Sequence, residues 1–501
     1  MTLDTQRADF INAYNPGSAQ TPNLDSLAKN GILYENCFCL MPATLPSHAS
    51  IFFSRPPHDL KVYNNGQVIR KSRGNISITK IFKKHQYTTA AFISLGVLKS
   101  RFGLNDSFDL YNDDFFLQKY YITAEEINHK LLPWLEQNKK NNFFLWVHYS
   151  DPHAPYFPPN NEKTLKISLN NKPISEFVLQ KSKDIIDLTL KKGNNRLLFE
   201  VSNKMVDDPT SIHANFDKFN TEELEKRYNI KIQFAAGWRE QKSESNFACK
   251  KKAVIKIFNP DQSKRIKFPF RGKITIPFKY KRAYYRAEVE YMDNQIGSFL
   301  KKLKDLNLYK KTNILVVGDH GEGLGEYEKK PGAPHFGHIH FLYNVYMKVP
   351  FIIYRPDANS KAIRISDPVS LLDIAPTILG IMKFNKPLIY QGRNLIKRKS
   401  EENNKIFMEA YRPLADKNKF GIYHYPWHLI FTPEEQIYEL FNLINDPSEQ
   451  NNIINESPSP PILSTLKQEI NSFARKAISE KQALKIDKTD EEMLRALGYI
   501  K

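Results

Sequence analysis

The chain has 501 residues, 41% of them hydrophobic and 25% charged, which excludes a disordered or fibrous protein and leaves room for two or three folded domains. Its formal net charge of +19 comes largely from scattered lysines, so it indicates either attraction to anionic molecules or a solvated basic surface. Three cysteines, Cys37, Cys39 and Cys249, exclude a dense disulfide framework, and the lack of any run of 18 apolar residues predicts no membrane span.

Strand-like and helical patterns alternate through the first 160 residues, which is typical of an α/β fold. The apolar run 142–149 predicts a buried strand that ends at a polar loop containing His153. Apolar residues at three- and four-residue steps predict a helix over about 283–303, followed by a strand over 313–318 and the sequence Asp319-His320-Gly321-Glu322. Because ligands bind beyond the carboxyl ends of strands in open α/β sheets, we expect both polar clusters at one edge.

Between residues 164 and 278 the pattern changes to short strands separated by turns. Strands are expected over 165–169, 185–190, 197–201, 253–258 and 273–278, and together they predict an inserted β-sandwich. The insert contains no cluster of His, Asp and Glu at ligand spacing. Its expected role is therefore packing or covering the site, or alternatively binding a glycan or another polymer.

After residue 400, segments over 420–425, 427–431 and 438–443 predict a small antiparallel sheet, and a helical tail closes the chain. The expected fold class is α/β, with a mainly parallel sheet flanked by helices. The expected domains are a discontinuous catalytic domain over 1–160 and 279–400, the inserted β-sandwich over 161–278, and a smaller C-terminal α+β subdomain over 401–501.

The segment Ala43–Ser50 carries a hydroxyl, that of Thr44, ahead of a Pro-Ser pair, and alone this pattern is typical of a turn or a helix cap. Other segments supply groups that change the interpretation. A hydroxyl becomes a nucleophile when a divalent cation lowers its pKa, and carboxylates with an imidazole are usual ligands of such a cation. Asp4, Thr44, Asp319 and His320 fit that requirement, so the sequence predicts a hydrolase site.

Histidines supply the other groups that ester cleavage requires. The leaving group needs a proton, and the transferred anionic group needs positive charge or hydrogen-bond donors. His153 follows the strand over 142–149, while His335, His338 and His340 occupy a short glycine-containing segment that we expect to be a loop. The gathering of 4 of the chain's 13 histidines in two predicted loops indicates a functional role.

In order along the chain, these segments resemble those of the sulfatase family within the alkaline phosphatase superfamily, and the match covers most of the chain outside the insert. Asp4–Asp9 resembles the first metal-ligand segment, Thr21–Asp25 the helix start that follows it, and Thr44–Ser50 the nucleophile segment. The segments that are similar to later parts of the family are Asp151–Tyr156, Gly318–Glu326, His338–Pro350 and Tyr438–Asn451.

The resemblance implies an alkaline phosphatase-like fold and one divalent metal ion, calcium, manganese or zinc. Its ligands would be Asp4, Thr44, Asp319 and His320, with Thr44 acting as the nucleophile. The resemblance further implies roles for five more residues: His153, His338 and His340 as catalytic groups, and His48 and Asn65 as substrate-binding groups.

Three positions depart from the family pattern. Sulfatases carry Cys or Ser at the position of Thr44, which an accessory enzyme oxidises to formylglycine, and threonine cannot give that aldehyde because its carbinol carbon bears a methyl group. His48 stands where those enzymes have Arg, and Thr5 replaces a second ligand carboxylate. Because phosphoester-cleaving relatives in the superfamily use a threonine, the sequence predicts hydrolysis of a phosphoester, phosphonate ester or sulfate ester by metal-bound Thr44.

Two alternatives stay open: a sulfuric ester hydrolase that acts without formylglycine, and an inactive relative that binds an anionic glycan or polymer. The expected partner is an anionic ester derived from a carbohydrate or a lipid, and no nucleic-acid partner is expected.

Only Met1–Leu3 precede Asp4, although a central strand usually has five or six residues. As written, the chain is expected to be a soluble, cytoplasmic protein. The short first strand also indicates the alternative that the start site is misassigned and that a signal peptide lies upstream.

Overall fold

The chain divides into two units, one formed by Met1–Tyr156 with Tyr285–Lys501 and the other by Phe157–Tyr284. The computed structural model describes residues 1–70, 74–114, 120–154, 156, 163–178, 182–203, 213–217, 221–235, 238–241, 246–249, 252–275, 278–330, 332–356, 362–397, 405–412, 416–479 and 494. No helix within these residues is long and apolar enough to cross a membrane.

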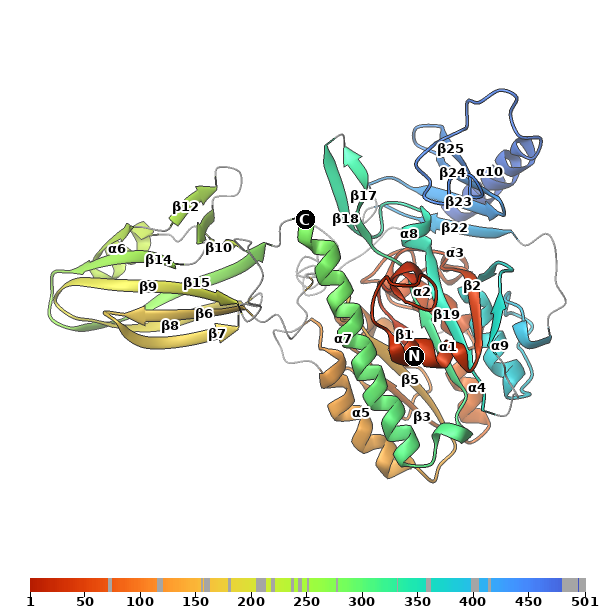
Figure 1. The fold of residues 1–501 in the computed structure, drawn as a ribbon, viewed down its shortest axis with the longest axis horizontal. Coiled ribbons are helices and arrows are strands. Elements are labelled where there is room, and N and C mark those ends of the chain that lie inside the picture. The colour runs from red at the N-terminus through yellow and green to blue at the C-terminus, as the bar shows by residue number, and fades with distance from the viewer. Residues whose placement is uncertain are drawn as a thin grey trace. The chain divides into compact units, whose positions relative to one another are not determined.

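Strands of the larger unit form a central sheet with the order β20-β2-β19-β16-β1-β5-β3-β4, and β21 pairs with β2 (Figure 1). β19 is antiparallel to its two neighbours and the other pairs are parallel, which confirms the predicted mainly parallel sheet. The strand bounds are β1 Thr2–Leu3, β2 Ile32–Phe38, β3 Thr88–Phe92, β4 Leu110–Asn112, β5 Phe143–Tyr149, β16 Ile314–Gly318, β19 Lys348–Tyr354, β20 Ile363–Ile365 and β21 Val369–Ser370.

Helices flank this sheet in two groups. In one group, Asp293 on α7 accepts hydrogen bonds from the backbone N–H groups of Asn23 (3.1 Å) and Leu24 (2.9 Å) at the start of α1. The Asn128 amide of α5 donates to the Gln295 carbonyl of α7 (2.9 Å), and Figure 1 shows α5 and α7 side by side. The second group is α2, α4 and α9. The bounds are α1 Pro22–Lys29, α2 Thr44–Phe53, α3 Pro57–Leu60, α4 Ile78–Lys84, α5 Ala124–Asn138, α7 Phe278–Asp305, α8 Asn344–Met347 and α9 Ile374–Ile381.

Continuous apolar runs explain why β5 and β16 occupy the middle of the sheet. Strands covered on both faces lose the usual alternation of polar and apolar residues, and Phe143–Tyr149 and Ile314–Gly318 contain almost no polar side chain. Both strands pair in parallel with the two-residue β1, where Leu3 is opposite Gly318 and Tyr149. The carboxyl ends of these three strands therefore lie together at one edge of the sheet.

At the opposite edge, where β5 and β16 begin, the short β1 leaves a gap. A cavity of about 610 Å³ lies there, and its lining includes Met1 together with Phe144, Trp146 and Leu315 of the neighbouring strands. The Met1 amino group donates to the Leu315 carbonyl (2.7 Å), and burial lowers the pKa of this amino group to about 5.

The smaller unit contains two antiparallel sheets, β12-β13-β10-β15-β8 and β11-β14-β9-β6-β7. Apolar residues of both sheets, among them Phe199, Ile255 and Phe268, form one buried cluster, which confirms the predicted β-sandwich. The bounds are β6 Lys163–Leu169, β7 Lys172–Val178, β8 Ser182–Leu190, β9 Gly193–Asn203, β10 His213–Asp217, β11 Lys231–Phe234, β12 Trp238–Gln241, β13 Asn246–Cys249, β14 Lys252–Asn259, β15 Lys264–Thr275 and α6 Thr221–Tyr228. The expected strand over 273–278 was partly wrong, because β15 ends at Thr275 and α7 begins at Phe278.

The C-terminal part forms the predicted antiparallel sheet, β22-β23-β24-β25, against which α10 packs. Its bounds are β22 Ile406–Ala410, β23 Lys419–His424, β24 Trp427–Thr432, β25 Ile437–Asn442 and α10 Leu463–Ser479. Before it, β17 (Gly323–Lys330) and β18 (Ala333–Gly337) form a hairpin. His335 therefore lies in a strand, and the expectation of a loop was wrong at this residue.

Candidate functional site

The candidate site lies at the carboxyl ends of β1, β5 and β16. Asp4 follows β1, and its backbone N–H donates to the Tyr149 carbonyl at the end of β5 (2.9 Å). Asp319 follows β16, and its N–H donates to the Leu3 carbonyl (3.3 Å). His153 lies in the loop after β5. The parallel register thus brings together the two polar clusters that were expected at one edge.

Thr44 is the first residue of α2, and its side chain faces the strand ends. Its Oγ1 lies 3.4 Å from Asp4 Oδ1 and 3.3 Å from His320 Nε2. The ten residues of α2 are all buried, so the start of this helix lies inside the protein. Backbone N–H groups at a helix start favour negative charge, which suits an oxygen that ionises there.

Asp4, Asp319 and His320 form a group that offers two carboxylates and one imidazole to a cation. One ligand atom from each lies within 4.8 Å of the others, and all three side chains are fully buried. Asp4 Oδ2 and Asp319 Oδ2 have no hydrogen-bond partner among the described residues. Burial raises the pKa of Asp4, and burial with the nearby Asp4 carboxylate raises the pKa of Asp319 further. A divalent cation would offset the free-energy cost of burying two ionised carboxylates side by side, so the donor set fits a metal ion.

His320 is oriented to present a lone pair to this group. Its Nδ1 lies 2.9 Å from the Gly321 carbonyl oxygen, which only accepts, so Nδ1 carries the proton and Nε2 does not. Metal-binding histidines usually donate their other ring N–H in this way. Close packing explains Gly321, because a Cβ atom there would lie 2.0 Å from the Val345 carbonyl oxygen.

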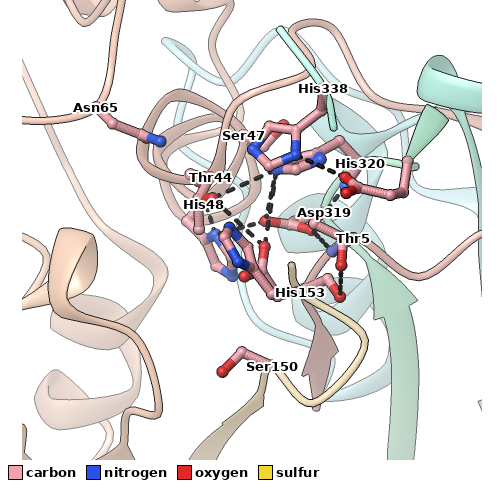
Figure 2. A network of polar contacts seen from close by, with 12 residues as sticks. Thr5, Thr44, Ser47, His48, Asn65, Ser150, His153, Asp319, His320 and His338 are labelled. Carbon is pink, nitrogen blue, oxygen red and sulfur yellow. Dashed lines mark hydrogen bonds and ion pairs between the residues drawn. The ribbon is translucent and has the colours of Figure 1, made fainter. Parts of the chain in front are cut away.

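Thr5 turns away from the cluster (Figure 2). Its backbone is in the left-handed region, with φ of 54°, and its N–H donates to Asp319 Oδ1 (3.1 Å). Its hydroxyl lies 2.7 Å from the Asp4 carbonyl oxygen and 2.9 Å from the Pro152 carbonyl oxygen. Such backbone strain is often found at functional sites. Thr5 thus orients Asp319 through the backbone while its side chain is engaged elsewhere.

His153 and His338 lie beside the group. The Nδ1 of His153 is 2.7 Å from the Ala154 carbonyl oxygen, and the Nδ1 of His338 is 2.7 Å from Glu322 Oε2. Ring centroids of His338 lie 4.3 Å from His320 and 5.4 Å from His153. Burial lowers the pKa of His153, and it lowers that of His338 to about 3. Both rings are therefore neutral near pH 7, with the proton on Nδ1.

Asn65 supports the start of α2. Its Oδ1 accepts the Leu45 N–H at the start of α2 (2.8 Å), while its Nδ2 is buried and has no partner among the described residues. In Figure 2 this nitrogen points toward the cluster. Asn65 can therefore fix α2 and also present a donor to the site.

His48 and His340 lie differently from the other predicted site residues. The Nδ1 of His48 is 2.8 Å from the Thr44 carbonyl oxygen, and its Nε2 is 3.0 Å from the Thr2 hydroxyl, so both nitrogens are engaged inside the protein. This arrangement favours support of Thr44 over contact with substrate. His340 is partly exposed, and its Nδ1 lies 3.6 Å from Asp416 Oδ2.

Sequence reasoning missed three residues around the site. Glu322 is fully buried and accepts hydrogen bonds from the Tyr156 hydroxyl (2.6 Å) and from His338. Arg7 is buried, donates to the Glu322 carbonyl (3.1 Å) and forms an ion pair with Glu326. The signal for Glu322 was its place two residues after His320, and the signal for Tyr156 was its place in the family-like segment Asp151–Tyr156.

Comparison with known proteins matches the sulfatase family over residues 1–384 and the C-terminal part of N-sulphoglucosamine sulphohydrolase over residues 335–476. The chain belongs to the sulfatase family. It is 23% identical to an N-acetylglucosamine-6-O-sulfatase of Bacteroides thetaiotaomicron, over 91% of this chain and 82% of that protein. It is 24% identical to an arylsulfatase of Clostridium perfringens, over 90% of this chain and 89% of that protein.

Solved structures show the same fold. One, a complex with its substrate D-glucosamine-2-N,6-O-disulfate, has a TM-score of 0.63 at 17% identity and covers 98% of both chains. A phosphonate monoester hydrolase from Silicibacter pomeroyi has a TM-score of 0.60 at 16% identity, over 96% of this chain and 94% of that one. This sulfatase-family chain is therefore an ester hydrolase with an alkaline phosphatase-like fold, and its structural relatives act on more than one kind of ester.

Proposed function

We propose that this sulfatase-family protein hydrolyses a phosphoester or phosphonate ester through attack by the Thr44 hydroxyl. The observation that carries the proposal is the position of Thr44 Oγ1, 3.4 Å from Asp4 Oδ1 and 3.3 Å from His320 Nε2, beside the buried group that Asp319 completes. A divalent ion held by Asp4, Asp319 and His320 would lower the pKa of this hydroxyl and balance negative charge on the transferred group.

The chain's own residues supply the remaining chemistry. The Thr44 oxygen bonds to phosphorus while the bond to the leaving oxygen breaks, and water then releases the transferred group from Thr44. The start of α2 and the Asn65 amide face the developing negative charge as hydrogen-bond donors. His153 and His338 lie where protons must be exchanged with the leaving oxygen and with water.

The identity of residue 44 favours phosphorus over sulfur as the reacting atom. Oxidation of threonine would give a ketone rather than the aldehyde on which formylglycine chemistry depends. A phosphonate monoester hydrolase among the structural relatives supports this choice. Sulfate ester hydrolysis without formylglycine is the second candidate, because the relatives identified by sequence are named as sulfatases.

A substrate panel tests both candidates. The full chain is freed of metal with a chelator, reloaded separately with calcium, manganese or zinc, and assayed on 4-nitrophenyl phosphodiester, phosphonate and sulfate esters. We expect metal-dependent cleavage of the phosphorus esters, and an unmodified threonine in the mass of the peptide that contains residue 44. Cleavage of the sulfate ester alone would establish the second candidate in place of the first.

Variants at residue 44 test the nucleophile. Thr44→Ala should lower turnover on the order of 10³-fold or more, since groups of a catalytic unit fail together when one is removed. Thr44→Ser keeps the hydroxyl and is the matched control once the mass of the peptide shows that the serine is not oxidised to formylglycine, with activity expected within about tenfold of the parent. Equal rates for Thr44→Ala and the parent, with both chains folded and loaded with metal, would exclude Thr44 as the nucleophile.

A further inference from the structure

Glu322 is a buried carboxylate with two hydrogen-bond donors and no place in the chemistry described so far. Its side chain is fully buried, its Oε1 accepts the Tyr156 hydroxyl (2.6 Å), and its Oε2 accepts Nδ1–H of His338 (2.7 Å). Burying an ionised carboxylate costs free energy unless charge-assisted hydrogen bonds compensate, and distances this short are those of strong bonds of that kind. The chain maintains this costly arrangement next to the reacting groups.

Three separate segments meet at Glu322. Tyr156 comes from the chain after β5, Glu322 from the turn between β16 and β17, and His338 from the end of the β17–β18 hairpin. The backbone of Glu322 is fixed by its N–H, which donates to the Val345 carbonyl (3.1 Å), and by its own carbonyl, which accepts from Arg7 (3.1 Å). Glu322 is therefore the rigid partner of the pair with His338.

His338 depends on that partner for its orientation. It lies between Gly337 and Ile339, both of which have positive φ, 106° and 84°. A carboxylate oxygen only accepts, so the pair with Glu322 fixes the proton on Nδ1 of His338 and leaves the lone pair on Nε2. The centroid of the His338 ring lies 4.3 Å from that of the His320 ring, and His320 Nε2 lies 3.3 Å from Thr44 Oγ1. The structure thus sets the ring, its tautomer and its position beside the reacting groups.

We propose that Glu322 is a positioning residue that holds His338 as the proton carrier between the Thr44 hydroxyl and the leaving oxygen of the ester. This inference rests on the function proposed above. As the bond from Thr44 Oγ1 to the central atom forms, the hydroxyl proton passes to His338 Nε2. As the bond to the leaving oxygen breaks, the same proton passes from Nε2 to that oxygen. The Glu322 carboxylate stabilises the imidazolium formed in between and takes up no proton, as in other carboxylate-histidine pairs.

The dependence of rate on the leaving group tests this role. Full-length, metal-loaded parent, Glu322→Gln and Glu322→Asp chains are assayed on a series of esters whose leaving alcohols range from 4-nitrophenol to a simple alkanol. For Glu322→Gln we expect a loss in kcat that grows from less than about threefold with 4-nitrophenol to about 10- to 100-fold with the alkanol, and a nearly unchanged KM. Glu322→Asp keeps the charge and should recover part of the loss.

Glu409→Gln is the matched control, because Glu409 on β22 is also a buried carboxylate bonded to a histidine, His58 (2.8 Å), and to a tyrosine hydroxyl, that of Tyr411 (2.8 Å), but takes no part in the proposed chemistry. Its effect on kcat should be small and equal for every leaving group. An equal loss for all leaving groups in Glu322→Gln, or no loss, would overturn the proposal. If Glu322→Gln fails to fold, the loss in kcat across the leaving groups is measured instead for Glu322→Asp and His338→Gln.

Two further readouts separate positioning from mere structural support. Metal content of Glu322→Gln should equal that of the parent, and the ¹⁵N chemical shifts of His338 should change from the Nδ1–H form toward a mixture of tautomers. An unchanged His338 tautomer would contradict the assigned role. Failure of the proposed function would look different: parent and Thr44→Ala chains would then cleave every ester at the same rate.

Discussion

The two units of this protein divide charge and chemistry between them. Residues 157–284 contain 27 Lys and Arg against 14 Asp and Glu, whereas the rest of the chain contains 46 against 40. The larger unit buries acids and histidines, including Asp4, Asp319 and His320. Among the described residues of the smaller unit, the buried polar side chains are those of Asn195 and Asn259.

This difference follows from the free energy that a buried charge and a solvated charge each cost. An ionised group in the interior is expensive unless a partner or a metal ion compensates it, so buried acids mark the place where chemistry is carried out. Charge on a solvated surface is inexpensive, and it attracts oppositely charged molecules over a distance. We infer that the larger unit determines the reaction and that the smaller unit contributes affinity for anionic partners.

The largest expected effect concerns the buried acids. Asp319→Asn keeps the oxygen that accepts the N–H groups of Thr5 and His320, but removes the charge of a proposed metal ligand. We expect loss of stoichiometric metal binding and a fall in activity on the order of 10³-fold or more. Because burial disfavours the ionised form of Asp319, the metal-free variant should melt above the metal-free parent. Metal analysis measures the bound ion, and thermal melts compare the metal-free chains. A metal-free variant that melts below the metal-free parent would show that the buried Asp319 carboxylate does not destabilise the fold.

The second prediction concerns Asp151, whose pKa burial raises from 3.8 to about 7. Between these values the folded chain holds a proton that the unfolded chain has lost, so the free energy of unfolding falls as pH rises from about 4 to about 7. The fall should reach roughly 4 kcal/mol, and Asp151→Asn should remove it. In the smaller unit, Lys264 lowers the pKa of the exposed Asp261, so Asp261→Asn is the control that should leave this pH window unchanged. Urea melts between about pH 4 and pH 7 measure the free energy of unfolding of the parent and of each variant. An equal dependence of this free energy on pH in the parent and Asp151→Asn would contradict the raised pKa of Asp151.

The smallest expected effect concerns the charge of the insert. Arg196 and Lys256 lie opposite each other on β9 and β14, both exposed, and like charges in that position weaken a sheet slightly. Replacing both by Gln should weaken binding of a sulfated polysaccharide such as heparin about two- to fivefold at low salt, and raise stability a little. Cleavage of a small nitrophenyl ester should not change.

The double variant Lys140→Gln and Lys301→Gln is the control in the larger unit, since it removes the same charge from exposed positions there. It should reduce polysaccharide binding less than the insert variant does. Equal reductions would show that total charge, rather than the insert, governs attraction.

The sequence was informative wherever local pattern and burial agree. The continuous apolar run of β5 and the helical periodicity of α7 predicted those elements, although α7 begins earlier than expected, at Phe278. In the insert, β7, β10 to β13 and α6 were missed because their short segments carry many polar residues and weak periodicity. The rule that parallel strands carry the residues that follow them to one edge predicted that the polar clusters containing His153 and Asp319 lie together.

Contacts between side chains distant in the sequence could not be predicted in the same way. The pairing of Glu322 with His338 depends on the β17–β18 hairpin, and the contact with Tyr156 on a loop from another strand. His340 was grouped with His338 because it is two residues away, and its contact with Asp416 (3.6 Å) could not be predicted from that spacing. The roles of the remaining site residues stay predictions until variants are measured.

The gap beneath β1 offers a route to a more robust protein that leaves the reacting groups untouched. A larger apolar side chain at Leu315, such as Leu315→Phe, would occupy part of the cavity of about 610 Å³ that Phe144 and Trp146 also line. Filling apolar space there without forcing neighbouring side chains apart should raise the melting temperature by a few degrees. A designer who needs a heat-tolerant esterase could begin at this end of the sheet.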